Sequence, residues 1–239
     1  MRALLLAAGL GTRLRPLTDT VPKCLVDVGG VPLLDRWIDL LADGSMESVL
    51  VNLHHLADVV AGHLGRGPHA IPVSTIREPE LLGTGGTLLR NRAFFGDGPA
   101  MVVHADNLSL FNVRSFVERF ETRLPGIEIT MMTFHTDTPR SCGIVELDGD
   151  GTVRGFHEKV DDPPGDLANA AVYIVAPSVI DFIAGLGKPI VDLSTEVLPH
   201  FIGRINTFEN TVYHRDIGTP QSLAVARHEF SRLQLASRG

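Results

Sequence analysis

Apolar positions in the first half of the chain fall into short runs, separated by stretches with a helical period. The first run ends in Ala8-Gly9, which is typical of a buried strand that leads into a turn. We expect strands over residues 2–7, 48–53, 71–76 and 100–104. Apolar side chains between them recur every three or four residues and predict helices over 33–41, 56–64 and 87–95. This alternation favours an α/β fold whose mostly parallel sheet carries helices on both faces.

The pattern changes after Ile127, where strand-like segments follow one another with shorter connections. These predicted strands cover residues 129–134, 143–147, 153–156 and 170–175. Asp148-Gly149-Asp150-Gly151 is a strong hairpin signal between two of them. Helical patterns follow over residues 179–184, 192–201 and 219–235. We interpret the second half as completing the sheet and adding a subdomain over its carboxyl edge, within a single domain of residues 1–239.

Composition and charge restrict the classes of function. The chain has 239 residues, 44% of them apolar, and no apolar run of about eighteen residues that would predict a membrane span. Its N-terminal apolar stretch is too short for a signal peptide. The net charge of −7 argues against a broad nucleic-acid surface. The two cysteines, Cys24 and Cys142, show no metal-binding spacing, so we expect free thiols and a cytoplasmic protein without nucleic-acid or membrane partners.

Three loops that could contribute functional residues follow predicted strands, at Gly9, Gly83 and Asp106. The carboxyl ends of parallel strands lie at one edge of a sheet, and ligands bind there. We therefore expect these three loops to meet at one site.

The first of these loops runs from Leu6 to Thr18 and continues to Pro22-Lys23. Its glycines allow backbone N–H groups to approach phosphate oxygens without a Cβ in the way. Arg13 can donate to two phosphate oxygens at once, and Lys23 adds a compact charge. The third Gly of a Rossmann fingerprint is absent, which disfavours an NAD-dependent oxidoreductase. A Walker loop is also excluded, because no Gly-Lys-Ser/Thr occurs.

Several acidic residues have positions that fit a phosphate site. A carboxylate at Glu78 or Glu80 could accept hydrogen bonds from the ring N–H and amino group of guanine, whereas uracil and thymine offer one N–H. Asp106 directly follows an apolar strand, where an aspartate is either a Mg²⁺ ligand or a helix cap. Asp216 precedes a Gly-Thr-Pro turn and helix start. Glu158, beside Lys159, is by itself more typical of a solvated charge pair.

In this order the motifs resemble those of the sugar-1-phosphate nucleotidyltransferase family. The family signature is Gly-Gly-x-Gly-Thr-Arg-Leu-x-Pro-Leu-Thr, then Pro-Lys-Pro. Here Ala8-Gly9 replaces the glycine pair, Cys24 replaces the last Pro, and Val160 follows Lys159 where a Pro is common. The resemblance implies a Rossmann-like sheet flanked by helices, of the nucleotide-diphospho-sugar transferase type. Residues 1–125 would mainly bind the nucleotide, and residues 126–239 would bind the sugar phosphate and include the C-terminal helix.

The resemblance also implies a role for each motif. The implied catalytic residues are Arg13, Lys23, Asp106, Lys159 and Asp216, with Mg²⁺ held by Asp106 and Asp216. The nucleotide is implied to contact Leu6, Ala8, Gly9, Gly11, Thr12, Arg13, Lys23, Glu78, Gly83, Thr84 and Gly85. The sugar phosphate is implied to contact Asn107, Gly143, Glu158, Lys159 and Asn169.

We therefore expect an enzyme that transfers a nucleoside monophosphate from a triphosphate to a sugar 1-phosphate and releases pyrophosphate. GTP and mannose 1-phosphate are the first choice, because the resemblance is greatest to bacterial guanylyltransferases of mannose 1-phosphate. Guanylyl transfer to a heptose 1-phosphate, and uridylyl or thymidylyl transfer to another hexose 1-phosphate, stay open. The non-enzyme alternative is a regulatory homologue that binds a nucleotide-sugar. The sequence leaves open whether the chain forms a homo-oligomer.

Overall fold

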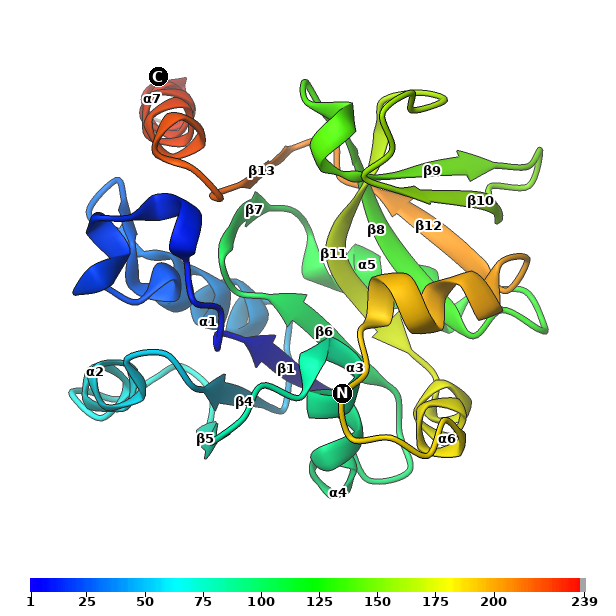
Figure 1. Cartoon of the computed structure of the whole chain (residues 1–239), viewed down its shortest axis with the longest axis horizontal. Helices are drawn as coiled ribbons and strands as arrows, with labels where there is room; N and C mark the ends of the chain where they lie inside the picture. The colour runs from blue at the N-terminus through cyan, green and yellow to red at the C-terminus, as the bar shows by residue number, and fades with distance from the viewer. Residues whose placement is uncertain (237–239) are drawn as a thin grey trace.

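The structure, a computed structural model, describes residues 1–236 and has four parallel strands at one end of its main sheet (Figure 1). In the order β6-β1-β4-β5 these strands are β6 (Ala100–His104), β1 (Arg2–Leu6), β4 (Ser48–Leu53) and β5 (Val73–Arg77). The apolar runs of β6, β1 and β4 reflect burial on both faces, and Ala3, Leu4 and Leu5 have no exposed surface. The strands that the sequence predicted in this half are confirmed, with β5 shifted slightly toward the C-terminus.

Helices cover both faces of this sheet. The helices of the first half are α1 (Leu33–Asp43), α2 (Ala57–Leu64), α3 (Gly83–Arg90), α4 (Arg92–Phe95) and α5 (Val113–Glu121). Apolar side chains of α1, α2 and α5 pack on one face, and those of α3 and α4 pack on the other. The predicted helix 87–95 is wrong as a single element, because Asn91 leaves helical geometry and separates α3 from α4.

The second half adds antiparallel strands to the same sheet. They are β8 (Ile129–His135), β9 (Gly143–Leu147), β10 (Val153–Glu158) and β11 (Leu167–Val175), with β12 (Ile205–Glu209) pairing β8 in parallel. Strand β11 pairs with β6 and joins the two halves into one sheet. The hairpin at Asp148-Gly149-Asp150-Gly151 is confirmed: β9 pairs with β10, and the Asp148 carboxylate accepts from the amides of Asp150 and Thr152.

Helix α6 (Pro177–Gly185) packs on the same face as α3 and α4. The remaining elements are α7 (Pro220–Ala236), the ribbon of β7 (Asn107–Leu110) with β13 (Tyr213–Asp216), and the short pair β2 (Asp27–Val28) and β3 (Val31–Pro32). The predicted helix over 192–201 is wrong. Leu193–Val197 is one turn of π-helix and Leu198–Phe201 one turn of 3-10 helix, because Pro199 has no N–H for a continuous α-helix.

A third apolar cluster fastens α7 to the glycine-rich N-terminal segment. Leu14, Val28 and Leu33 pack with Ile217 and Phe230 in this cluster. Figure 1 accordingly shows α7 beside the first, blue-coloured segment, across from β8–β10. Among residues 1–236, no helix combines the length and apolarity needed to cross a membrane. The predicted α/β fold class is confirmed, with the parallel strands in the first half and the antiparallel addition in the second.

Candidate active site

The loop after β1 contains two glycines in different surroundings. Gly11 has a φ of +61°, and a Cβ at this position would lie 2.8 Å from Thr18 Cγ2. The Thr18 hydroxyl donates to Gly11 O at 2.6 Å, so backbone conformation and packing both require glycine there. The nearest atom to a Cβ on Gly9 would be Asp106 Oδ2, at 3.9 Å. Gly9 therefore lies against the carboxylate that follows β6.

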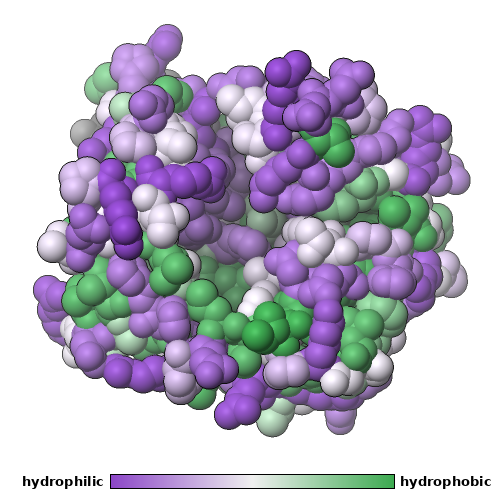
Figure 2. Space-filling model, in the orientation of Figure 1, coloured by the Kyte–Doolittle hydropathy of each residue, from purple (hydrophilic) through white to green (hydrophobic). Residues whose placement is uncertain are grey.

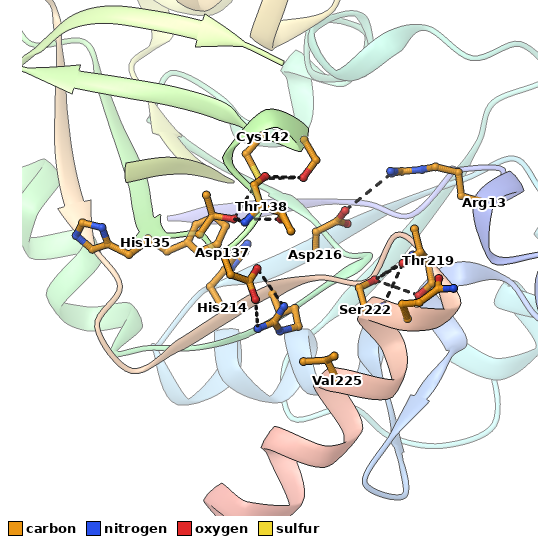
Figure 3. Close-up of a pocket in the computed structure, with 15 residues that line it drawn as sticks. Arg13, His135, Asp137, Thr138, Cys142, His214, Asp216, Thr219, Ser222 and Val225 are labelled. Carbon is orange, nitrogen blue, oxygen red and sulfur yellow. Dashed lines mark hydrogen bonds and ion pairs between the residues drawn. The ribbon is translucent and has the colours of Figure 1, made fainter. Parts of the chain in front are cut away.

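Lys23 links the two aspartates of the predicted metal site. Its Nζ donates to Asp106 Oδ2 at 2.6 Å and to Asp216 Oδ1 at 3.5 Å. Both distances start at one atom, so these two oxygens are at most their sum, 6.1 Å, apart. Figure 3 shows Arg13 pointing at Asp216, with Nη2 at 3.9 Å from Oδ2. The four side chains thus form a continuous row of alternating charge.

The β7–β13 ribbon explains how two carboxylates so distant in sequence become neighbours. Asp216, the last residue of β13, pairs with Asn107, the first residue of β7 and the one after Asp106. The ribbon is anchored to α1, because the buried Asn107 accepts a hydrogen bond on its carbonyl oxygen from Trp37 Nε1 at 2.9 Å. Periodicity cannot predict this pairing, since each strand is four residues long and β13, Tyr-His-Arg-Asp, shows no apolar alternation.

Asp106 holds its negative charge at lower pH than an ordinary aspartate. Burial disfavours the carboxylate, but the charge and hydrogen bond of Lys23, with a smaller contribution from His104, outweigh it and lower the pKa of Asp106. Burial lowers the pKa of the His104 imidazole, which is therefore neutral at pH 7. The ionised Asp106 and the ammonium of Lys23 form a close ion pair beside Gly9.

A cavity of about 230 Å³ lies at the carboxyl ends of β1, β4 and β5. Glu78 follows β5 and is 4% exposed, with Oε2 accepting from Asn52 Nδ2 at 3.2 Å. Its Oε1 has no hydrogen-bond partner among the described residues. An unpaired buried carboxylate oxygen is costly, which makes Glu78 receptive to a ligand N–H. The cavity is lined by Leu6, Ala8, Gly9, Asn52, Glu78, Leu81, Gly83, Thr84, Thr87, His104 and Asp106.

The glycines of the second loop pack against the chain rather than facing open space. A Cβ at Gly83 would lie 2.5 Å from Val191 O, and one at Gly86 would lie 2.3 Å from Pro189 O. The amides of Gly85 and Gly86 both donate to Val191 O, at 2.8 and 3.1 Å. Gly85 does not line the cavity, and neither do Gly11 and Thr12 of the first loop. Small residues here allow α3 to approach the segment before the π-turn.

Of the residues predicted to bind the sugar phosphate, Asn107 lies beside Asp106 in the ribbon, and Gly143, Glu158, Lys159 and Asn169 form a separate group. Glu158 Oε2 lies 2.6 Å from where a Cβ on Gly143 would be, and Glu158 Oε1 is 2.9 Å from Lys159 Nζ. The Lys159 backbone has a φ of +50°, a conformation that non-glycine residues adopt rarely and often at functional sites. Asn169 Nδ2 donates to Tyr173 Oη at 2.6 Å. Within residues 1–236, no hydrogen bond or ion pair joins this group to Lys23, Asp106 or Asp216.

A larger cavity of about 490 Å³ extends from Asp216 to Cys142, the residue before Gly143 (Figure 3). The space-filling view shows a hollow in the middle of the molecule, with mostly hydrophilic side chains above it and hydrophobic ones below it (Figure 2). Its wall includes Arg215, which donates to Glu229 at 2.9 and 3.0 Å and to Asp137 at 3.2 Å. The cavity thus begins at the charged row and ends at the loop that carries Gly143.

Two residues at the site were not singled out in the sequence. Asn52 contacts Glu78, and its signal was a polar residue inside the apolar run of β4. Arg215 ties β13 to α7 through Glu229, and the sequence gives no signal for it because its partners are remote in the chain.

Comparisons with known proteins identify similar nucleotidyl transferases. A family model described as nucleotidyl transferase matches residues 2–232. Mannose-1-phosphate guanylyltransferase of Mycobacterium tuberculosis is 30% identical over 224 residues, which are 92% of this chain and 61% of the relative. The chain thus spans about three fifths of the length of that relative.

A uridylyltransferase is also among the relatives. N-acetylmuramate alpha-1-phosphate uridylyltransferase of Caulobacter vibrioides is 33% identical over 186 residues, covering 74% of this chain and 76% of the relative. The crystal structure of HddC from Yersinia pseudotuberculosis complexed with GMP-PN superposes with a TM-score of 0.80 and 26% identity. It covers 96% of this chain and 99% of HddC. Relatives of this chain therefore differ in the nucleobase they use.

Proposed function

The chain belongs to the nucleotidyl transferase family, and we propose that it transfers a nucleoside monophosphate from a nucleoside triphosphate to a sugar 1-phosphate. The observation that carries this proposal is the row Arg13–Asp216–Lys23–Asp106 between the two cavities. The smaller cavity, with its unpaired Glu78 oxygen, would take the nucleobase. The sugar phosphate would approach from the side of Cys142 and Lys159.

The proposed reaction is one in-line displacement. An oxygen of the sugar 1-phosphate forms a bond to the α-phosphorus while the bond from that phosphorus to the β-phosphate oxygen breaks, and pyrophosphate leaves. Both reactants are anions, so the protein must offset repulsion and fix their alignment. Arg13 and Lys23 would neutralise the triphosphate and Lys159 the sugar phosphate. Orientation of two bound reactants can contribute roughly 7–11 kcal/mol.

The residues present fit a divalent cation. Lys23 already binds between Asp106 and Asp216, so the two carboxylates accept positive charge at one place. Two carboxylates are a typical protein share for Mg²⁺, which takes its other ligands from phosphate and water. No group of three or more His, Cys, Asp or Glu with metal-binding geometry occurs in the described part of the chain, which fits such a shared site. When bound there, Mg²⁺ would supply charge neutralisation at the phosphates.

Guanine is the base that Glu78 fits best. A carboxylate only accepts hydrogen bonds, and guanine offers it two adjacent donors, N1–H and the 2-amino group. Uracil and thymine offer one N–H between two carbonyls. A guanylyltransferase and HddC with GMP-PN are among the similar proteins, which supports this choice, while the uridylyltransferase represents the alternative.

Mannose 1-phosphate is the proposed acceptor, and a heptose 1-phosphate is the second candidate. Glu158 would accept from sugar hydroxyls, and Gly143 lets this carboxylate lie close to β9, because a Cβ there would meet Glu158 and Phe156. Asn169 and Asn107 would complete the contacts to the sugar phosphate. Asn169 is held in place by Tyr173 and by Ala171 N–H, so its position is fixed before substrate arrives.

Pyrophosphate release tests the proposal. The purified chain is incubated with Mg²⁺ and each pair from GTP, UTP, dTTP and ATP with mannose, heptose, glucose and N-acetylmuramate 1-phosphates. We expect release with GTP and mannose 1-phosphate, and loss of it in Asp106→Asn and Asp216→Asn. Release with no pair would favour the regulatory, nucleotide-sugar-binding alternative. Full activity in either variant would contradict the metal site.

A further inference from the structure

The side chain of Asn52 connects three loops at the wall of the smaller cavity. Its Oδ1 accepts from Ala7 N at 2.8 Å, and its Nδ2 lies 3.2 Å from Glu78 Oε2 and 3.5 Å from Thr87 Oγ1. Asn52 is 3% exposed. A backbone N–H can only donate, so Ala7 fixes the amide oxygen on its own side and turns the NH₂ group toward Glu78. The orientation of the amide is therefore determined by the fold.

This contact leaves Glu78 with one held oxygen and one free oxygen. The hydrogen bond from Asn52 restrains Oε2, and Oε1 has no partner among residues 1–236. A carboxylate with a fixed plane can align both oxygens with two neighbouring donors. If Glu78 were free to rotate, it could still meet a single N–H but would align with a pair less often.

Asn52 also connects this carboxylate to the glycine-rich loop. Ala7 lies between Leu6 and Ala8, which both line the same cavity. A movement of Glu78 that breaks the bond to Asn52 would thus also disturb the backbone beside the nucleotide. The position of the carboxylate and the position of the loop are set by one buried amide.

We propose that Asn52 is the positioning residue for nucleobase choice, acting through Glu78 so that the carboxylate matches the paired donors of guanine. The proposal rests on the proposed function only for the nature of the ligand, a guanine nucleotide. Hypoxanthine keeps N1–H and the 6-oxygen of guanine but lacks the 2-amino group. The ratio of the Kd for ITP to the Kd for GTP therefore measures the second contact.

The test is isothermal titration calorimetry of GTP and ITP, without a sugar phosphate, on four proteins: wild type, Asn52→Ala, Glu78→Gln and the double variant. We expect wild type to bind GTP at least about tenfold more tightly than ITP, the factor to which about 1.4 kcal/mol corresponds. Asn52→Ala should bring this ratio to within about twofold of unity. In the Glu78→Gln background, Asn52→Ala should cause no further change, because residues that act as one unit are not additive.

Asn206→Ala is the matched control. Asn206 is also a buried strand asparagine, and its Oδ1 accepts from Thr130 Oγ1 at 2.6 Å in β8, away from both cavities. Its loss should lower stability and leave the ITP-to-GTP ratio unchanged. If Asn52→Ala does not fold, Asn52→Ser provides the same test, because the shorter hydroxyl loses the reach to Glu78.

Four results would overturn the inference. They are equal binding of GTP and ITP by wild type, an unchanged ratio in Asn52→Ala, an equal effect of Asn52→Ala with and without Glu78→Gln, and a changed ratio in Asn206→Ala. Because these are binding measurements, an absence of pyrophosphate release would contradict the proposed reaction and leave this result standing.

Discussion

Gly86→Ala tests whether packing requires a glycine in the second glycine-rich loop. A Cβ on Gly86 would lie 2.3 Å from Pro189 O and 3.1 Å from Leu82 Cβ. The first contact is with backbone, so α3 or the 189–191 segment must move. Overpacking of this kind costs about 1–3 kcal/mol. Replacing glycine inside a helix returns about 0.5–1 kcal/mol, so we expect net destabilisation of up to about 2.5 kcal/mol.

Thermal unfolding measures this change. About 1 kcal/mol shifts Tm by roughly 2–4 °C in a domain of this size, so Gly86→Ala should lower Tm by up to about 10 °C. Its KM for the triphosphate should rise, because Gly83 and Thr84 at the start of α3 line the cavity. Gly62→Ala is the control: Gly62 lies inside α2 with no atom near the added Cβ, so Tm should rise slightly. An equal rise in Gly86→Ala would refute the packing argument.

Three further predictions concern the charged row and its supports. Lys23→Met should lower kcat about 10- to 150-fold, the value of one hydrogen bond to a charged group, while Arg66→Met, which removes an exposed cation of the α2 end, should leave kcat unchanged. Burial, with the nearby Asp106 charge, raises the pKa of Cys24 from 9.0 to about 12. The unfolded chain therefore loses this proton first as pH rises, and stability falls between pH 9 and 12. Relative to Cys24→Ala, wild type should lose up to about 1.4 kcal/mol per pH unit there in denaturant titrations. Trp37→Phe leaves Asn107 O without its donor, so we expect the Mg²⁺ concentration that gives half-maximal activity to rise. An unchanged Mg²⁺ titration would mean that the β7–β13 ribbon is fixed by other contacts.

Much of the fold could be predicted because local patterns and tertiary environment agree. The runs in β1, β4 and β6 are buried on both faces, so periodicity was sufficient. Helix α5 was missed although Val113, Phe116 and Phe120 form its buried stripe, since Asn112 as N-cap was not recognised. The ribbon of β7 and β13 could not be found from either strand, because its stability comes from pairing and from Trp37.

In the site, too, local motifs identified individual residues, whereas contacts between remote segments could not be predicted. The sequence identified Asp106, Asp216 and Lys23 as candidates, and the structure brings them into direct contact. The sequence could not show that Lys23 lies between the two aspartates, because this contact brings together three segments that are far apart in the chain. The resemblance implied that Gly83 and Gly85 contact the nucleotide, whereas in the structure Gly85 and Gly86 pack against Val191 and Pro189. The role of Asn52 depends on Glu78 and Ala7, which no local pattern connects to it.

The most direct test is ³¹P NMR of the chain with GTP, mannose 1-phosphate and Mg²⁺. If this chain is a sugar-1-phosphate guanylyltransferase, the signals of a guanosine diphospho-sugar and of pyrophosphate will appear in equal amounts as both substrates disappear. Asp216→Asn protein at the same concentration will leave both substrates intact. Pyrophosphate formed with free GMP and unchanged mannose 1-phosphate would contradict transfer, as would a spectrum that stays unchanged with every triphosphate and sugar 1-phosphate.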